Sequence, residues 1–159
     1  MVFDSKEQRR IFGRFATGVT VVSTLAGNDT WGMTANAVTS LSLDPPLILV
    51  AVVRDSSTDG YLKASRCFAV SILAADQRDL STRFSSPGPR DFSDLKVKTA
   101  VTGCPILVDA IGWVDCRVIE IHSGGDHEIY LGEILAGDAH DHEKKPLLFY
   151  GGKYSELAE

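Results

Sequence analysis

The chain has 159 residues, of which 44% are hydrophobic and 23% are charged, and its formal net charge is −5. This length suits one compact domain with a sizeable core, so we predict a single domain over residues 1–159. A negative charge without any basic run argues against a nucleic-acid surface. The longest apolar stretches have the length of a strand rather than of a membrane span, and the charged N-terminus lacks an apolar signal core. We therefore expect a cytoplasmic protein with no nucleic-acid or membrane partner.

The first predicted helix begins close to the N-terminus. Asp4 or Ser5 can cap it, because a short polar side chain accepts a hydrogen bond from the free amides of the first turn. Gly18 should mark its end. Three large side chains form its apolar face, namely Ile11, Phe12 and Phe15.

Most other predicted elements are strands, because short apolar and β-branched runs are bounded by turn residues. The predicted strands cover residues 19–26, 31–38 with an extension at 41–43, 47–53, 67–73, 111–121, 127–136 and 147–150. Two further short helices are predicted, at residues 58–65 and 75–84. Since few helices separate the strands, the pattern favours an antiparallel barrel with helical excursions over a parallel sheet.

A cluster of hydroxyl groups follows the apolar run at residues 47–53. Ser56, Ser57 and Thr58, together with the cation of Arg54, can hold a phosphate through charge-assisted and backbone hydrogen bonds. Alternatively, these hydroxyls only cap the following helix, although a capped helix start also binds anions. Two interpretations of Arg54 stay open, because it can pair with a phosphate or with Asp55 and solvent.

The cysteines and histidines show no spacing typical of a metal site or of a disulfide framework. The three cysteines, Cys67, Cys104 and Cys116, are predicted to be reduced thiols packed as small hydrophobes. A second group resembles metal ligands only superficially, since it lies in one charged loop without a partner cluster: His140, Asp141, His142 and Glu143. We therefore predict no metal.

Five segments, spread nearly end to end along the chain, carry a resemblance to one protein family. They read FATGVTVVST (residues 15–24), GMTANAVTSLSLDPPLILV (32–50), FAVSILAADQRDLSTRF (68–84), GGDHEIYLGEI (124–134) and PLLFYGGKY (146–154). In this order they resemble the flavin reductase domain of two-component flavin-dependent monooxygenases. The resemblance implies a mainly β, antiparallel split barrel with a few short peripheral helices, acting as a homodimer with flavin near the subunit interface.

The same resemblance implies an activity. An NAD(P)H:flavin oxidoreductase of this kind uses NADH or NADPH to reduce FMN, or FAD, and the reduced flavin then leaves for a partner oxygenase. The short chain and compact phosphate motif favour FMN. No catalytic acid or base is predicted, because the two cofactors carry the hydride transfer themselves.

Site residues are also implied by position. The segment expected along the edge of the flavin ring, where backbone amides should be accessible, is Trp31, Gly32, Met33, Thr34, Ala35, Asn36 and Ala37. The residues expected along the ribityl chain and the phosphate are Ala51, Val52, Val53, Ser56, Ser57 and Thr58, with Arg83 and Phe84 closing the site. The residues expected on the nicotinamide side are His127, Tyr150, Gly151, Gly152, Lys153 and Tyr154.

Some alternatives stay open at this point. His127 can instead bond the backbone of its own turn. Gly151 and Gly152 stand where many relatives have an arginine, which supports a flavin- or haem-binding module without rapid reductase turnover. An oxidase of a pyridoxine phosphate ranks last, because no additional basic cluster is present for that phosphate.

Overall fold

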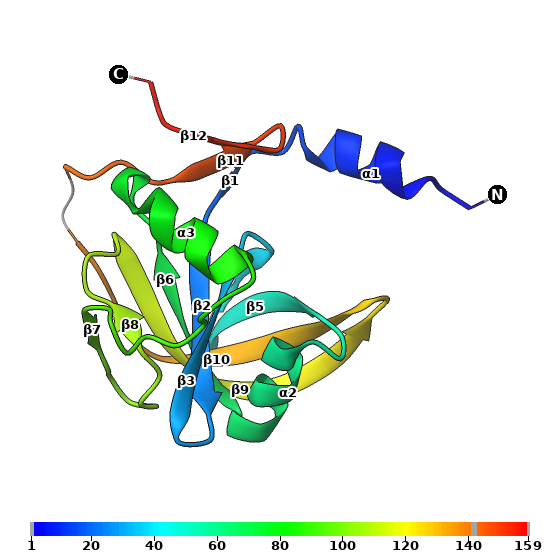
Figure 1. Cartoon of the computed structure of the whole chain (residues 1–159). Helices are drawn as coiled ribbons and strands as arrows, with labels where there is room; N and C mark the ends of the chain where they lie inside the picture. Colours follow the sequence, from blue (N-terminus) through cyan, green and yellow to red (C-terminus); the bar gives the residue numbers. More distant parts are fainter. Residues whose placement is uncertain (1, 141–142, 159) are drawn as a thin grey trace.

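A seven-stranded antiparallel sheet forms the body of this computed structural model, which describes residues 2–140 and 143–158 (Figure 1). Its strand order is β3-β2-β6-β9-β10-β5-β4. The strands are β2 (Thr20–Ala26), β3 (Asp29–Ala35), β4 (Val38–Leu43), β5 (Pro46–Val53), β6 (Cys67–Ile72), β9 (Gly112–Gly124) and β10 (His127–Ala139). Although only residues 36–37 separate β3 from β4, these strands form opposite edges of the sheet. The sheet therefore curls until its edges approach without pairing, and the predicted split β-barrel is confirmed.

The barrel interior is filled by side chains that alternate along each strand. In β5, Ile48, Val50 and Val52 are buried, whereas the intervening residues are more exposed. They pack with the fully buried rings of Phe68 and Tyr130. A pattern of period two places every second side chain on one face of a strand. Burying each such side chain contributes about 1.5–3 kcal/mol, so this interior dominates the stability of the barrel.

A second core lies on the other side of the main sheet, beneath a helix and a small three-stranded sheet (Figure 1). The elements are a 3-10 turn (Ala75–Gln77), α3 (Arg78–Ser85), β1 (Thr17–Gly18), β11 (Leu148–Tyr150) and β12 (Lys153–Ser155). The last strand was not predicted. It forms because Gly151 (φ 59°) and Gly152 (φ 77°) make a two-residue hairpin loop whose left-handed backbone favours glycine.

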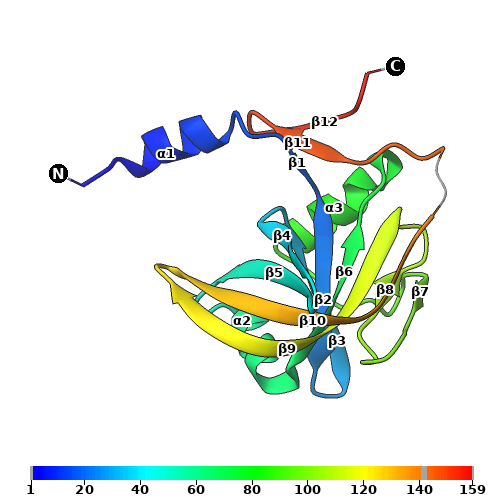
Figure 2. The same ribbon diagram turned by 180° about the vertical axis from the view of Figure 1, so that it is seen from behind.

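The predicted first helix is shorter than expected. α1 covers Ser5–Phe12, with Asp4 as N-cap and Gly13 rather than Gly18 as C-cap. The chain ends the helix there because Thr17 and Gly18 pair with β11, a contact that no local pattern reveals. α1 extends away from the body in both views and has no buried residue (Figures 1 and 2).

Other predicted boundaries shift where distant segments pair. Residues 41–43 belong to the separate strand β4 rather than extending β3, and two unpredicted short strands, β7 (Val97–Lys98) and β8 (Ile106–Leu107), pair with each other. β9 and β10 form a long hairpin whose tip extends from the barrel (Figure 2). The remaining helix, α2 (Ser57–Ser65), follows β5 as predicted. Over the ranges 2–140 and 143–158, no helix has the length and apolar character to span a membrane.

Candidate functional site

A mainly apolar cleft of about 1090 Å³ opens where the barrel splits, between the sheet and the N-terminal segment. Sheet side chains on one wall are Thr20, Val38, Thr39, Ser40, Ile48, Val70, Ile72, Val114 and Ile134. The opposite wall and rim are formed by Arg9, Phe12, Gly13, Phe15, Ala16, Thr17, Gly18, Asn36, Ala37, Phe149 and Gly152. A concave apolar surface with a few polar groups at its edge is typical of a small-molecule site.

The polar edge of the cleft contains Asn36 and Ala37, where the chain crosses from one sheet edge to the other. Both residues are exposed and both line the cleft. The carbonyl of Ala37 accepts a hydrogen bond from the Ala51 amide at 3.0 Å. Three of the predicted flavin residues therefore meet here: Asn36 and Ala37 at the crossing, and Ala51 on β5.

The preceding residues of the predicted ring edge are engaged within the protein. Met33 packs against the barrel core, and the carbonyl of the buried Ala35 accepts a hydrogen bond from Thr20. Thr34 donates its hydroxyl to the carbonyl of Ser81 at 2.6 Å. Of the predicted segment, only Asn36 and Ala37 face the cleft.

Gly32 corrects the expectation of accessible amides along this segment. Its amide donates to the carbonyl of Arg90 at 2.8 Å. A Cβ at this position would lie 2.6 Å from the Phe84 ring and 2.8 Å from the Phe92 ring. A side chain at this position would clash with these rings, so the close approach of β3 requires glycine here.

Trp31 and Thr58 come together, but inside the protein. The indole Nε1 of Trp31 donates to the hydroxyl of Thr58 at 2.9 Å, and its ring lies 5.1 Å from that of Tyr61. Thr58 is only 5% exposed. This pair therefore ties β3 to the start of α2, and the Thr58 hydroxyl is not at the surface.

The start of α2 confirms the capping interpretation of the hydroxyl cluster. The Ser56 hydroxyl accepts a hydrogen bond from the Asp59 amide at 3.2 Å and donates to the carbonyl of Val53 at 2.7 Å. Ser57 is exposed. The free amides and positive dipole end of a helix N-terminus also suit an anion, so a phosphate role is compatible with this cap.

Arg54 has a partner that neither interpretation of its sequence considered. Its Nε lies 3.2 Å from Oε1 of Glu128, and its Nη2 donates to the Ser123 hydroxyl. Glu128 also lies 3.5 Å from Nζ of Lys63. One carboxylate on β10 thus holds two cations beside the start of α2.

Asp59, which the sequence analysis missed, anchors α2 to the barrel. Its carboxylate accepts hydrogen bonds from Lys63 Nζ at 2.8 Å, from the Asp55 amide at 2.9 Å and from the Tyr130 hydroxyl. Burial opposes ionisation of Asp59, but the bonds from Lys63 and Tyr130 outweigh it and lower its pKa. Burial, with the neighbouring Asp59, raises the pKa of Tyr130. The available sequence signal was the Ser56-x-x-Asp59 spacing, typical of a capped helix start.

Arg83 and Phe84 do not line the cleft. The guanidinium of Arg83 makes a two-pronged bond to the carboxylate of Asp94, at 2.9 and 2.7 Å, and donates to the Asp91 carbonyl. Phe84 is fully buried and stacks on Phe92 with ring centres 4.7 Å apart. Both residues fasten the 91–94 loop to α3, and neither lines the cleft.

The residues predicted for the nicotinamide side fall at two separate places. His127 lies at the base of the β9–β10 turn, opposite Val53, with Nδ1 2.7 Å from the Asp126 carboxylate. The 150–154 segment forms the β11–β12 hairpin at another end of the molecule (Figures 1 and 2). There Tyr154 bonds Ser81 at 2.7 Å, and Tyr150 accepts from Arg14. One chain does not bring these groups together.

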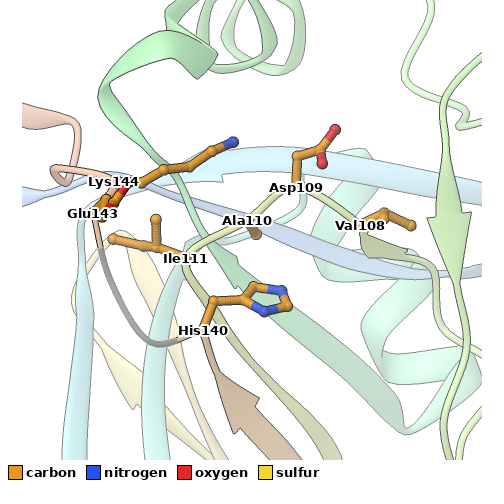
Figure 3. A pocket seen from close by; sticks show the side chains of 7 residues that line it. All are labelled: Val108, Asp109, Ala110, Ile111, His140, Glu143 and Lys144. Atoms are coloured by element: carbon orange, nitrogen blue, oxygen red, sulfur yellow. The ribbon is translucent and has the colours of Figure 1, made fainter.

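A second, smaller hollow of about 560 Å³ is lined by residues of the charged loop (Figure 3). Its lining consists of Val108, Asp109, Ala110, Ile111, His140, Glu143 and Lys144. Asp141 and His142 lie outside the described residues. In Figure 3 the Asp109 and Lys144 side chains lie on one side of the backbone at Ala110, and the His140 ring lies on the other. Across residues 2–140 and 143–158, no three His, Cys, Asp or Glu side chains are grouped to hold a metal ion.

Comparison with known families gives a match over almost the whole chain. Residues 12–158 match the family described as flavin reductase like domain. The chain belongs to this family. The family predicted from the five sequence segments is therefore confirmed, as is flavin reductase function at that level.

Similar proteins of known name agree with this assignment. The chain is 38% identical to the NADH-dependent FAD reductase of Streptomyces globisporus, over 98% of this chain and 87% of that protein. It is 33% identical to the reductase subunit HsaB of a flavin-dependent monooxygenase of Mycobacterium tuberculosis, over 97% of this chain and 83% of that protein.

Solved structures share the whole fold. The flavin reductase component of a bacterial two-component tryptophan halogenase superimposes with a TM-score of 0.91 at 38% identity, over 98% of this chain and 99% of that one. The Streptomyces globisporus NADH:FAD oxidoreductase, in complex with NAD and FAD fragments, superimposes with a TM-score of 0.89 at 35% identity. That match covers 99% of this chain and 97% of the other.

Proposed function

We propose that this flavin reductase transfers a hydride from NADH to FMN or FAD and releases the reduced flavin to a partner oxygenase. The observation that carries the proposal is the apolar cleft at the barrel split, whose edge is formed by Asn36 and Ala37 beside Ala51. NADH is favoured because relatives at 38% and 37% identity are named as NADH-dependent, one with FAD and one with FMN. We retain FMN as the first flavin to test, with FAD as the alternative.

The residues of this chain fit a flat, partly polar ring. Ile48, Val70 and Val114 provide an apolar wall that excludes water, and the Asn36 side chain provides hydrogen-bonding groups at the edge. When bound, the flavin and the nicotinamide supply the redox chemistry between them. The protein's part is to hold the two rings in contact and in the correct orientation, which lowers the entropic part of the barrier.

The anionic tail of the flavin belongs at the start of α2. Ala37 bonds Ala51, and β5 then runs from Ala51 through Val53 to the cap at Ser56. Ser57 is exposed at that point, and the positive dipole end of α2 lies beside it. We assign Ser56 and Ser57 to the phosphate, with Thr58 supporting them from the interior.

A second copy of the chain completes the site in this proposal. His127 and the 150–154 hairpin are apart in one chain, although the family resemblance places both beside the nicotinamide. α1 projects from the body, and Phe12 at its end and Phe15 just after it are exposed and line the same cleft. A homodimer in which α1 packs on the neighbouring subunit would cover these rings and unite the two groups. We also propose that residues 1–159 act as a single domain.

The oxygenase partner follows from the relatives. Proteins at 33% and 34% identity are named as reductase components of two different monooxygenases, so similar reductases serve different oxygenases. We propose transfer by diffusion of reduced flavin. In this proposal the oxygenase, and no residue of this chain, determines which substrate is oxidised.

Anaerobic turnover tests the activity directly. Purified protein mixed with NADH and free FMN should bleach the visible absorbance of oxidised flavin, and parallel runs with NADPH and FAD rank the cofactors. Asn36→Ala should raise the KM for flavin, whereas Asp109→Ala, in the separate hollow at residues 108–111, should leave it unchanged. Absence of turnover with every nucleotide and flavin pair would defeat the proposal.

A further inference from the structure

Two of the three cysteines, separated by 37 positions, meet inside the protein. Cys67 opens β6, and Cys104 lies in the loop that connects β7 and β8. Their sulfur atoms are 3.5 Å apart. Both belong to a small core with Ala69 and Ile106, outside the cleft proposed for flavin.

The loop that carries Cys104 is fastened next to β6. The buried carboxylate of Asp115 accepts hydrogen bonds from the amides of Val101 and Thr102, at 2.7 and 2.8 Å, and from the Thr102 hydroxyl. The Cys104 amide donates to Thr102 Oγ1 at 3.2 Å. Val101 and Gly103 on this anchored loop are exposed, whereas Cys104 is fully buried and Cys67 is 9% exposed.

The environment of the pair favours reaction at Cys67. The Cys104 thiol donates a hydrogen bond to the Cys67 sulfur and lowers the pKa of Cys67 to about 7. The same contact and burial raise the pKa of Cys104. Because the thiolate is the nucleophile, Cys67 is the member of the pair that attacks an oxidant.

Cys116 provides a contrast within the same sheet. It lies opposite Phe68 and packs in the barrel interior, on the other face from Cys67. It is fully buried, and burial, with a contribution from Asp115, raises its pKa to about 12. Its thiol is therefore unreactive at neutral pH.

We propose that Cys67 and Cys104 are a redox modification site that forms a reversible disulfide with hydrogen peroxide. The Cys67 thiolate attacks one peroxide oxygen, the O–O bond breaks, and a sulfenic acid and water result after protonation. The Cys104 sulfur then attacks the Cys67 sulfur, and the S–O bond breaks with loss of a second water. In sum, two thiols and one hydrogen peroxide give one disulfide and two waters.

The source of peroxide rests on the proposed function. Reduced flavin that meets molecular oxygen before it meets an oxygenase gives oxidised flavin and hydrogen peroxide. The protein would thus be exposed to the oxidant made from its own product. The bond would close the 67–104 segment, which contains β6 and α3, and restrict the unfolded chain. We expect the midpoint of thermal unfolding to rise by about 10 °C on oxidation.

Peptide mapping of the intact protein tests the proposal. Wild-type protein is treated with a small excess of hydrogen peroxide, alkylated while denatured and cleaved before aspartates. The three cysteines then fall on separate peptides, at residues 59–75, 94–108 and 115–125. The expected product joins the 59–75 and 94–108 peptides, lighter by two hydrogen atoms than their sum, and dithiothreitol restores both free thiols.

Matched variants and a second source of oxidant sharpen the result. Cys116→Ser should give the same linked peptides, and Cys104→Ser should give none. Alkylation of all three thiols after peroxide treatment, linkage through residues 115–125, or disulfides only between molecules would each overturn the proposal. A further experiment generates the peroxide with NADH, FMN and air, with and without catalase. It separates the proposal that peroxide oxidises the cysteine pair from the proposal that enzymatic turnover is the source of that peroxide. If the Cys67–Cys104 disulfide forms with added peroxide but not during turnover, only the proposed enzymatic source of peroxide is overturned.

Discussion

The helices α1 and α2 have nearly the same length, eight and nine residues, and both begin at a polar N-cap. They differ in what lies beneath them. α2 buries Thr58, Asp59 and Leu62 against the barrel, whereas α1 buries no residue. A short isolated helix is marginal in water, so tertiary contacts decide whether such a segment is stable.

The difference teaches where each helix obtains its stability. α2 is stabilised by contacts within one chain. Asp59 accepts hydrogen bonds from Lys63 and from the Tyr130 hydroxyl, and Trp31 donates to Thr58. α1 is linked to the body just past its C-terminus by the Gly151 amide, which donates to the Gly13 carbonyl at 2.8 Å. The exposed rings of Phe12, at the end of α1, and Phe15, just after it, are not covered within one chain. In our proposal a second subunit covers them.

The largest effect is expected from removing the anchor of α2. Asp59→Ala leaves the Tyr130 hydroxyl and Lys63 without their carboxylate partner, and should lower the free energy of unfolding by about 3 kcal/mol. Urea denaturation measures this. Asp4→Ala, which removes the cap of α1, should cost less than about 0.5 kcal/mol in global unfolding, because α1 is exposed. If both variants lost the same free energy of unfolding, the proposed difference between the helices would be wrong.

Removing the aromatic side chains of the α1 segment should affect assembly rather than folding of the body. Phe12 and Phe15 are 66% and 71% exposed in one chain, and each fully buried ring would contribute about 1.5–3 kcal/mol to a dimer. Phe12→Ser combined with Phe15→Ser should weaken dimerisation by about 100-fold or more in sedimentation equilibrium. Val101→Ser, at a site 64% exposed elsewhere, is the matched control. A double variant that dimerises like wild type would show that α1 is not at the interface.

A carboxylate at the start of α2 tests the phosphate site. Ser57→Asp should weaken binding of FMN by about tenfold, because it places a negative charge beside the phosphate. The fold should persist, since an acidic residue is favourable in the first turn of a helix. Riboflavin, which lacks the phosphate, is the control ligand and should bind both proteins equally. Loss of riboflavin affinity to the same degree would instead indicate a disturbed ring site.

The smallest effect is a dependence on pH. The pKa of Asp59 is lowered in the folded protein below its ordinary value of 3.8, so its contribution is present above that value and disappears as the pH falls through the folded pKa. Asp59→Asn should cost about 1.5 kcal/mol at neutral pH. This difference from wild type should shrink below about pH 4 in urea denaturation at each pH. A difference that grows on acidification would mean that the carboxylate is protonated in the folded state.

Local patterns were sufficient for the elements whose residues interact with near neighbours. The apolar run at residues 47–53 became β5, and the Ser56 cap was recognised because its bonds join residues three positions apart. The ion pairs of Arg54 with Glu128 and of Arg83 with Asp94 could not be predicted from the sequence. A cation has many acceptors within reach along a sequence, and only packing selects one.

By itself, the sequence determined the family and the antiparallel strands, since these follow from alternation, composition and characteristic segments. Only the tertiary structure decided that the Gly32 amide donates to the carbonyl of Arg90, that the buried Thr58 bonds Trp31, and that Cys67 contacts Cys104. Each of these contacts joins residues at least 27 positions apart. Distances between such residues depend on how the sheet curls, and side-chain periodicity along a strand carries no information about that curvature.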